Sequence, residues 1–340
     1  MYEAFYNFSE MPFNLTPDPD FLYLSPGHRN AVTLLNYGLN NGDGFVLVTG
    51  EIGSGKTTLV RNLLRSIRPS IRPANVVNPK GTFRQLMRMI MAEFGVIPIT
   101  EEASRERLLA AFEQFVRERA KDNLPVIIII DEAQNVDPAT LEELRMLSNL
   151  ETEKKKLVQI VLVGQPELRR MLEAPELEQF NQRIAVRYHL AALSLQETEK
   201  YIRHRLEVAG GKDTPVKFAH DACRMIYAYS RGIPRKINVA CNQVLVIGYN
   251  EKKKSFDAKF VREVILGLDG ATDPDASLAE LERPEDTKAV PQASTSRYLR
   301  AEKPVLIGAA VGTAGFIVLV VFGWSTITGF IWSAVNLIFR

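Results

Sequence analysis

Cysteine is scarce in this chain of 340 residues, which contains only Cys223 and Cys241. Neither lies beside a second cysteine or a histidine pair, which argues against a disulfide scaffold and a cysteine-based metal site. Both are predicted to be small buried side chains in a reducing compartment. An excess of charge of one sign is also missing, because the net charge is only +2. Such a balance gives no support for a nucleic-acid partner.

A secretory signal is also lacking at the amino terminus. The first residues, MYEAFYNFSEMPFNLTPDPD, contain no basic region followed by an apolar run. The segment is rich in aromatic residues and proline instead. The chain is therefore expected to begin in the cytosol.

Short apolar runs alternate with amphipathic helical patterns in the first part of the sequence. The clearest runs are FVLVTG, PVIIIID and KLVQIVLVGQ, and two weaker ones are ANVVN and AVRYHL. Continuous apolar runs are typical of strands that are covered on both faces. The alternation predicts an α/β fold with a parallel sheet, in a domain at residues 1–192 that includes an amino-terminal extension.

The pattern changes after residue 192 to helices alone, separated by glycine and proline. This predicts a helical lid subdomain at residues 193–268. Residues 269–303 are rich in proline, serine and acidic side chains, a composition that predicts a flexible linker.

A long uncharged segment follows at residues 304–323. A helix needs about 20 apolar residues to cross the hydrocarbon layer, so this range predicts one transmembrane helix. The basic residues just before it place that side in the cytosol. Residues 324–340 carry an apolar stripe at helical spacing with Trp324 and Trp332, which predicts an interfacial or re-entrant tail.

The stretch GEIGSGKTT matches the phosphate-binding pattern G-x-x-x-x-G-K-[ST], and it lies between an apolar strand and a helix. The glycines let backbone N–H groups turn toward phosphate oxygens, and Lys56 is predicted to reach the β and γ phosphates. The Thr57 hydroxyl is predicted to bind Mg²⁺. The predicted nucleotide-binding residues of this loop are Gly50, Glu51, Ile52, Gly53, Ser54, Gly55, Lys56, Thr57 and Thr58.

A pair of acidic residues ends the next strong strand, in VIIIIDEAQ. Ligands bind at the carboxyl edge of such sheets, and Asp131 is predicted to lie there. Asp131 would hold Mg²⁺ together with Thr57, and Glu132 would act as a general base on the attacking water. The two motifs together predict an enzyme that binds ATP with Mg²⁺ and hydrolyses it.

Six sequence blocks resemble, in the same order, those of the general secretion pathway protein A family, the ExeA-type AAA+ secretion ATPases. The resemblance covers about residues 1–267, and it implies an AAA+ P-loop NTPase core followed by a helical lid. The blocks are MYEAFYNFSEMPFNLTPDPDFLYLSPGHRNAV, GDGFVLVTGEIGSGKTTL, IIIDEAQN, LVGQPELR, NQRIAVRYHL and SRGIPRKIN.

The resemblance implies further site residues. Gln165 matches the first sensor, which orients water near the γ-phosphate, and Arg235 matches the second sensor, which contacts phosphate from the lid. Arg183 matches the arginine finger that completes a neighbouring subunit's site, with Arg187 as the competing candidate. His28 lies in a matching block, which implies a place near the adenine, but we favour its interpretation as a residue of a helix's first turn without a ligand role. A finger acting in trans implies a homo-oligomer, expected as a hexameric ring.

The resemblance also implies a place at the bacterial inner membrane, with envelope secretion or polysaccharide-export components as partners. Longer members continue into a periplasmic peptidoglycan-binding region, whereas this sequence ends at Arg340, so a short member of the exopolysaccharide or exosortase type, or a truncated chain, is expected. Two alternatives stay open. One is a DNA-transaction ATPase of the transposition-regulator type, against which the charge balance and the apolar tail count. The other is an ATP-binding scaffold without turnover, against which Lys56 and Glu132 count.

Overall fold

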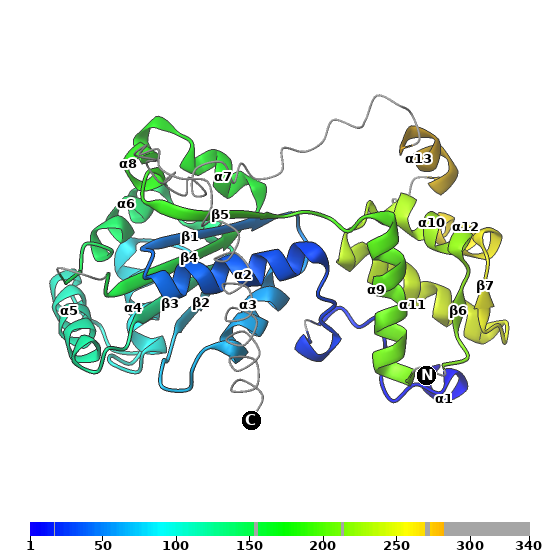
Figure 1. The fold of residues 1–340 in the computed structure, drawn as a ribbon, viewed down its shortest axis with the longest axis horizontal. Helices are drawn as coiled ribbons and strands as arrows, with labels where there is room; N and C mark the ends of the chain where they lie inside the picture. The colour runs from blue at the N-terminus through cyan, green and yellow to red at the C-terminus, as the bar shows by residue number, and fades with distance from the viewer. Residues whose placement is uncertain (17, 153–155, 212–213, 269–272, 282–340) are drawn as a thin grey trace, which may run out of the picture. The chain divides into compact units, whose positions relative to one another are not determined.

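A five-stranded parallel sheet forms the centre of the first part of the chain (Figure 1). The strand order is β2-β3-β4-β1-β5, and each pairing is parallel. Every residue of β1, β3 and β4 is buried, which explains why these strands are continuous apolar runs in the sequence. The predicted α/β fold with a parallel sheet is confirmed. The strands are β1 (Phe45–Gly50), β2 (Ala74–Val77), β3 (Val126–Asp131), β4 (Val158–Gly164) and β5 (Ile184–Leu190).

The computed structural model describes residues 1–16, 18–152, 156–211, 214–268 and 273–281, which belong to one compact unit, Met1–Ala293. The predicted transmembrane helix at 304–323 and the predicted tail at 324–340 lie outside the described residues, as does most of the predicted linker. None of the helices in the described ranges combines the length and the hydropathy that a membrane span requires.

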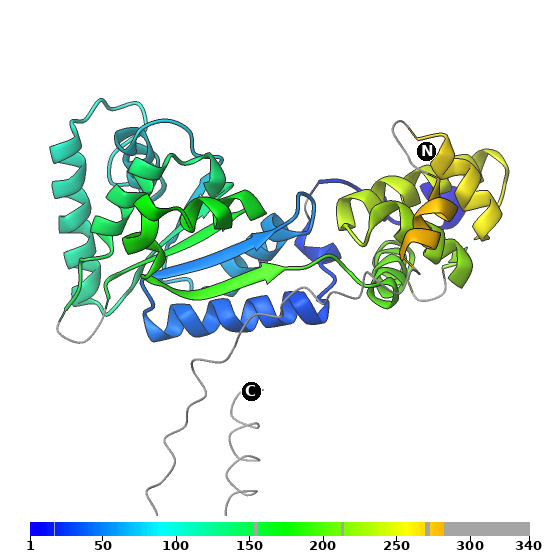
Figure 2. The ribbon, with the colours of Figure 1, turned by 90° about the horizontal axis from the view of Figure 1, so that it is seen from above.

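Helices cover both faces of the sheet. Side chains of β1 alternate between two hydrophobic clusters, with Phe45 and Leu47 in one and Val46 and Val48 in the other. The cluster around Val46 and Val48 includes α2 (Pro26–Asn41) and α3 (Lys56–Ser66). Figure 2 shows the blue helix α2 along one face and the green helices along the other. The cluster around Phe45 and Leu47 contains residues of α4 (Phe83–Glu93), α5 (Arg105–Lys121), α6 (Pro138–Leu147), α7 (Pro166–Leu172) and α8 (Glu178–Asn181).

A helical region follows the sheet, as the change of pattern at residue 193 predicts. Its helices pack around a hydrophobic cluster of their own. A short parallel pair, β6 (Lys217–Phe218) with β7 (Ser255–Phe256), joins two loops of this region and was not expected from the sequence. The main helices are α9 (Leu195–Gly210), α10 (His220–Ser230), α11 (Pro234–Asn250) and α12 (Ala258–Leu266).

Helix α13 (Pro274–Leu281) lies within the range that the sequence assigned to a linker. It packs against α10. Arg262 on α12 forms ion pairs with Asp273 and Asp275 at 2.6 Å each, which ties the start of α13 to the helical region. The acidic side chains of Asp273 and Asp275 therefore serve a local contact within the range 269–303 that the sequence assigned to a linker.

The amino-terminal segment, residues 1–16 and 18–24, packs mainly with the helical region. Five of its aromatic side chains are buried in the hydrophobic cluster of that region. Aromatic groups contribute large apolar areas to a core. Tyr6 Oη also donates to the backbone carbonyls of Leu245 at 3.0 Å and Lys253 at 3.1 Å. The sequence analysis assigned this segment to the domain at residues 1–192, whereas five of its aromatic side chains are buried in the core of the helical region. They are Tyr2, Tyr6, Phe8, Phe13 and Phe21.

Candidate functional site

The glycine-rich loop between β1 and α3 has a backbone that requires glycine at two positions. Gly53 has a φ of +79° and Gly55 a φ of +103°, in the region that L side chains rarely adopt. Space is also lacking, because an added Cβ would lie 2.5 Å from Cβ of Arg235 at Gly53 and 2.9 Å from Nε2 of His28 at Gly55. These two turns aim the loop's backbone at the amino-terminal end of α3, which is a binding site for anions.

Lys56 lies at the first position of α3 and is only 5% exposed. Its Nζ donates to the carbonyls of Gly50 at 2.7 Å and Glu51 at 2.9 Å, so the ammonium group is held within the loop. Burial lowers the pKa of Lys56, and the nearby carboxylates of Glu132 and Asp131 oppose that shift. A buried ammonium group surrounded by loop carbonyls is placed to meet the charge of a bound phosphate.

Asp131 and Thr57 are brought together where β3 ends. Thr57 Oγ1 donates to Asp131 Oδ2 at 3.1 Å, and Asp131 is 2% exposed. Burial raises the pKa of Asp131, while the hydrogen bond from Thr57 opposes the rise.

The hydroxyl of Thr57 and the carboxylate of Asp131 fit Mg²⁺, because this ion takes oxygen ligands and keeps water and phosphate in most positions. Across the described ranges, no group of three or more His, Cys, Asp or Glu side chains could hold an ion by itself.

Glu132 follows Asp131 in a left-handed backbone conformation, with φ of 57° and ψ of 40°. Such a conformation is uncommon for a residue other than glycine and is found at functional sites. Gln165, at the end of β4, donates from Nε2 to Glu132 Oε2 at 3.2 Å. The structure thus places the predicted sensor beside the predicted general base. Gln134 contacts the same carboxylate oxygen and was missed in the sequence analysis.

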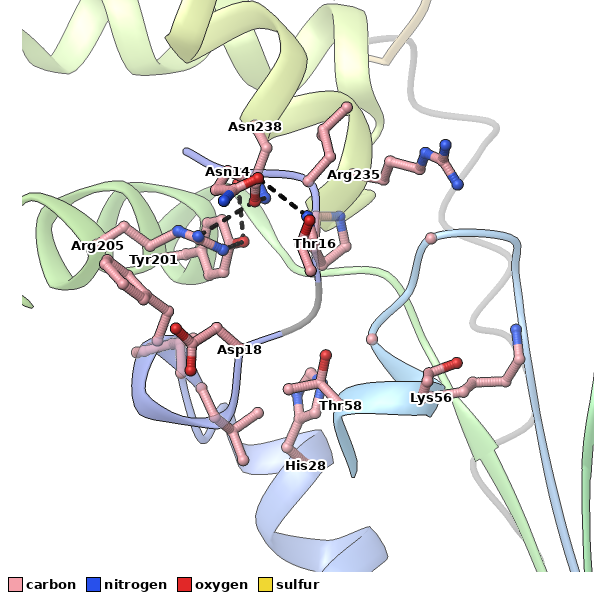
Figure 3. Close-up of a pocket in the computed structure, with 18 of the residues that line it drawn as sticks. Asn14, Thr16, Asp18, His28, Lys56, Thr58, Tyr201, Arg205, Arg235 and Asn238 are labelled. Carbon is pink, nitrogen blue, oxygen red and sulfur yellow. Dashed lines mark hydrogen bonds between the residues drawn. The ribbon is translucent and has the colours of Figure 1, made fainter. Parts of the chain in front are cut away.

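Arg235 reaches the site from the helical region. It lies at the start of α11, and its backbone N–H donates to the carbonyl of Gly53 at 3.2 Å. Its side chain lines the same pocket as Lys56 (Figure 3). Glu132 lines this pocket as well. Within the part of the chain that the structure describes, the guanidinium has no hydrogen-bond or ion-pair partner.

Arg183 lies far from this pocket. It precedes β5, whose first residue pairs with Phe45 at the start of β1, whereas the glycine-rich loop follows the end of β1. Six residues of a strand separate the two edges by about 20 Å. Arg183 Nη1 donates to Ser148 Oγ at 3.3 Å and also to Asn149 Oδ1. The competing candidate, Arg187, donates to the carbonyl of Asn181. The structure does not bring Arg183 to its own chain's site.

The pocket has a second wall, formed by the amino-terminal segment and held by helices of the lid. Arg205 on α9 donates to the carbonyls of Pro12 and Asn14, and its guanidinium lies over the ring of Phe21 at 4.7 Å. Tyr201 accepts from Arg205 Nη1 at 3.0 Å and donates to Asn238 Oδ1 at 2.8 Å. Sequence reasoning missed this network. The available signal was an arginine within the apolar stripe of α9, where a charged residue is unexpected.

We expect Arg205→Leu to lower stability and to weaken nucleotide binding. Arg205 is 6% exposed, and its loss leaves the buried carbonyl of Pro12 without its donor, whereas the carbonyl of Asn14 keeps a donor in Asn238 Nδ2. Each unsatisfied group costs about 1–3 kcal/mol. Thermal melts followed by circular dichroism and a nucleotide titration measure both effects. Arg203→Leu is the control, since Arg203 is an exposed residue of the same helix that pairs with Glu199. Wild-type melting and affinity in Arg205→Leu would show that the wall does not depend on this arginine.

His28 is buried against the glycine-rich loop. Its Nδ1 is hydrogen-bonded to Ser25 Oγ at 2.8 Å, and its Nε2 faces Gly55. The sequence predicted a residue of the first turn of α2 without a ligand role. The structure places it in that turn, and it also shows a packing role, because the imidazole supports the loop that would hold phosphate.

The burial of His28 predicts a loss of stability in mild acid. Burial lowers the pKa of His28, so the unfolded chain binds a proton first as pH falls below about 6.5. Stability contributed by the neutral ring is then lost, with a slope of at most about 1.4 kcal/mol per pH unit. Thermal melts between pH 7.5 and 5.5 should show a smaller acid shift in His28→Gln than in wild type. His220→Gln, at an exposed histidine, serves as the control. Equal acid shifts in all three proteins would refute the prediction.

The fold and the loop together define a P-loop nucleotide-binding protein of the AAA class. A family model described as an AAA domain matches residues 39–172. Over 253 residues the chain is 43% identical to General secretion pathway protein A of Aeromonas hydrophila, a match that covers 73% of this chain and 45% of that protein. The chain is therefore a relative of General secretion pathway protein A that contains an AAA domain, and it spans about half the length of this relative.

Solved structures with a similar fold include two archaeal proteins. The Aeropyrum pernix ORC2 protein, in a structure of its ADPNP–ADP complexes, has a TM-score of 0.58 at 19% identity, covering 76% of this chain and 72% of that one. Cdc6p from Pyrobaculum aerophilum has a TM-score of 0.58 at 16% identity, covering 78% of this chain and 70% of that one. Identities this low show the fold alone.

Proposed function

We propose that this chain hydrolyses ATP with Mg²⁺, as a membrane-anchored AAA+ ATPase that assembles or energises a bacterial envelope export system. One observation carries the proposal. Lys56, Thr57 and Glu132 line one pocket with Arg235, and Asp131 is hydrogen-bonded to Thr57 at its edge. Phosphoryl transfer needs little else from a protein than positioned positive charge, metal ligands and a residue that orients water.

Each residue has a defined task in the proposed reaction. The loop backbone and Lys56 bind the phosphates, and Thr57 with Asp131 would hold Mg²⁺, which when bound neutralises phosphate charge. Glu132 accepts the proton of the attacking water. Gln165 donates an amide hydrogen near that water, and Arg235 contacts phosphate from the lid. Positive charge and hydrogen bonds thus lie where negative charge develops in the transition state.

The position of Arg183 supports an assembly in which subunits complete each other's sites. Arg183 lies at the opposite edge of the sheet from the glycine-rich loop and contacts Ser148 and Asn149 there. A residue at that edge can serve a nucleotide only in a neighbouring copy. We therefore propose a homo-oligomer, with a hexameric ring as the expected form.

The membrane setting rests on the sequence of the tail and on the family. Residues 304–323 have the length and composition of a single span, with basic residues on the side of the ATPase region. The Aeromonas hydrophila relative is named for a general secretion pathway. These two facts support an inner-membrane location, a cytoplasmic ATPase region and partners among envelope secretion or polysaccharide-export components.

The test is ATP hydrolysis by the full-length chain in lipid nanodiscs, with the oligomer mass recorded with and without ATP. We expect turnover in the assembled fraction and an oligomer that ATP stabilises. If the chain binds ATP but shows no turnover in any oligomeric state, hydrolysis is refuted and the ATP-binding scaffold becomes the better description. If the chain is recovered without lipid or detergent as a soluble protein, the membrane anchor is refuted.

A further inference from the structure

Gln134 joins the Glu132 carboxylate to the end of β4. Its Nε2 donates to Glu132 Oε2 at 2.5 Å, and its Oε1 accepts the backbone N–H of Gln165 at 3.1 Å. The chemistry of the two partners fixes the orientation of the amide, because a carboxylate accepts and an N–H donates. Both polar atoms of the Gln134 amide are therefore hydrogen-bonded, and together they fix Glu132 relative to Gln165.

The carboxylate receives both of its amide donors on one oxygen. Gln134 and Gln165 each donate to Oε2 of Glu132. Within the described residues, Oε1 of Glu132 accepts no hydrogen bond, and Glu132 lines the pocket that contains Lys56. A carboxylate that is fixed through one oxygen in this way presents the other oxygen to the ligand space, where the proton of a bound water would be accepted.

The absence of a side chain at Gly164 leaves space for the amide of Gln134. Gly164 ends β4, and an added Cβ there would lie 2.8 Å from Gln134 Oε1 and 2.7 Å from Leu168 Cδ2. Glu132 itself has the left-handed backbone conformation, which costs energy for a side chain with a Cβ. The backbone conformation of Glu132 is unfavourable, and hydrogen bonds from two glutamines restrain its carboxylate in this position.

We propose that Gln134 is a positioning residue for the general base, and that it sets the orientation of Glu132 toward the attacking water. The inference rests on the proposed ATP hydrolysis and deepens it. Gln134 is not among the residues that line the pocket, so it acts through Glu132 and not on the nucleotide. Its removal must then change the rate of cleavage more than the affinity for ATP.

The first experiment separates rate from affinity in the full-length chain in nanodiscs. Gln134→Met keeps the length of the side chain and removes the amide. We expect kcat to fall by about 10- to 100-fold, the range found when a hydrogen bond that orients a site residue is lost. The Kd for ATP should change by less than about twofold. Gln114→Met is the matched control, because Gln114 donates to Glu118 at 2.9 Å on the exposed side of α5. An unchanged kcat, or equal losses of kcat and affinity, would overturn the proposal.

A double variant tests whether Gln134 acts through Glu132. In a Glu132→Gln background the proposal predicts no further loss from Gln134→Met, because the group that Gln134 orients no longer accepts a proton. If Gln134→Met lowers kcat by the same factor in the Glu132→Gln background as in wild type, the two residues act independently and the proposal is wrong.

A second readout needs no turnover and separates this inference from the proposed function. With ¹⁵N-glutamine labelling, the side-chain amide signals of Gln134 should be protected from hydrogen exchange, and Glu132→Ala should remove that protection. The Gln114 signals should not respond. If Glu132→Ala leaves the Gln134 signals unchanged, the contact is absent in solution and the inference fails, whether or not the chain hydrolyses ATP. If the signals respond but wild type shows no turnover, it is the proposed hydrolysis that fails, and with it the role of Gln134 as a positioning residue.

Discussion

Arg183→Ala is expected to lower ATP turnover by about 10³- to 10⁵-fold, the range in which an arginine finger contributes to phosphoryl transfer. The affinity of each subunit for ATP should change little, because Arg183 lies at the far edge of the sheet from its own pocket. Its guanidinium is held there by Ser148 and Asn149, on the surface where a neighbouring copy would bind. Turnover and ATP affinity of full-length assemblies in nanodiscs measure the two effects.

Mixed assemblies test the trans arrangement directly. Lys56→Ala subunits retain the finger but lack a working loop, whereas Arg183→Ala subunits retain the loop but lack the finger. Each variant alone should be nearly inactive, and mixing them should restore part of the turnover. Arg117→Ala removes an exposed arginine of α5 and serves as the control. No recovery on mixing would contradict a finger in trans, and a larger loss in Arg187→Ala would assign the finger to Arg187.

Glu132→Gln is expected to lower ATP turnover by about 10²- to 10⁴-fold, the usual contribution of a general base. The substitution keeps the shape of the side chain and removes its ability to accept a proton. The phosphate-binding contacts of the loop and Lys56 remain, so ATP binding should persist. We therefore expect an ATP-bound oligomer to accumulate, visible as bound nucleotide and as an increased mass.

The control for this substitution is Glu143→Gln, at a partly exposed glutamate of α6 that pairs with Arg105. That variant should turn over ATP like wild type. Turnover close to wild type in Glu132→Gln would show that another group accepts the proton. Loss of ATP binding in Glu132→Gln would show that the residue supports the pocket and is not a base.

The features that the sequence predicted are those that a few neighbouring residues determine. Continuous apolar runs mark β1, β3 and β4 because these strands are covered on both faces. The glycines and Lys56 lie between a strand and a helix within one short stretch, so the loop could be recognised without the fold. Ser25 as the cap and Pro26 as the first residue of α2 are another local signal of this kind.

The features that escaped prediction depend on contacts between residues far apart in the chain. Gln134 meets Gln165 through a hydrogen bond between two strand ends, and Arg205 meets Pro12, which lies 193 residues earlier in the chain. The aromatic residues of the amino terminus have no periodicity that shows which core they enter. Only the packing of α9 and α11 around them decides that Tyr6 lies with Leu245.

A single turnover of bound ATP would show directly whether this chain hydrolyses its nucleotide. Full-length wild type in nanodiscs is loaded with ATP labelled at the γ-phosphate, Mg²⁺ is added, and free phosphate is separated from protein-bound nucleotide over time. We expect wild type to release one phosphate for each bound ATP, while Glu132→Gln holds its ATP intact. Intact ATP in wild type over the same time, despite full occupancy and assembly, would refute ATP hydrolysis by this chain.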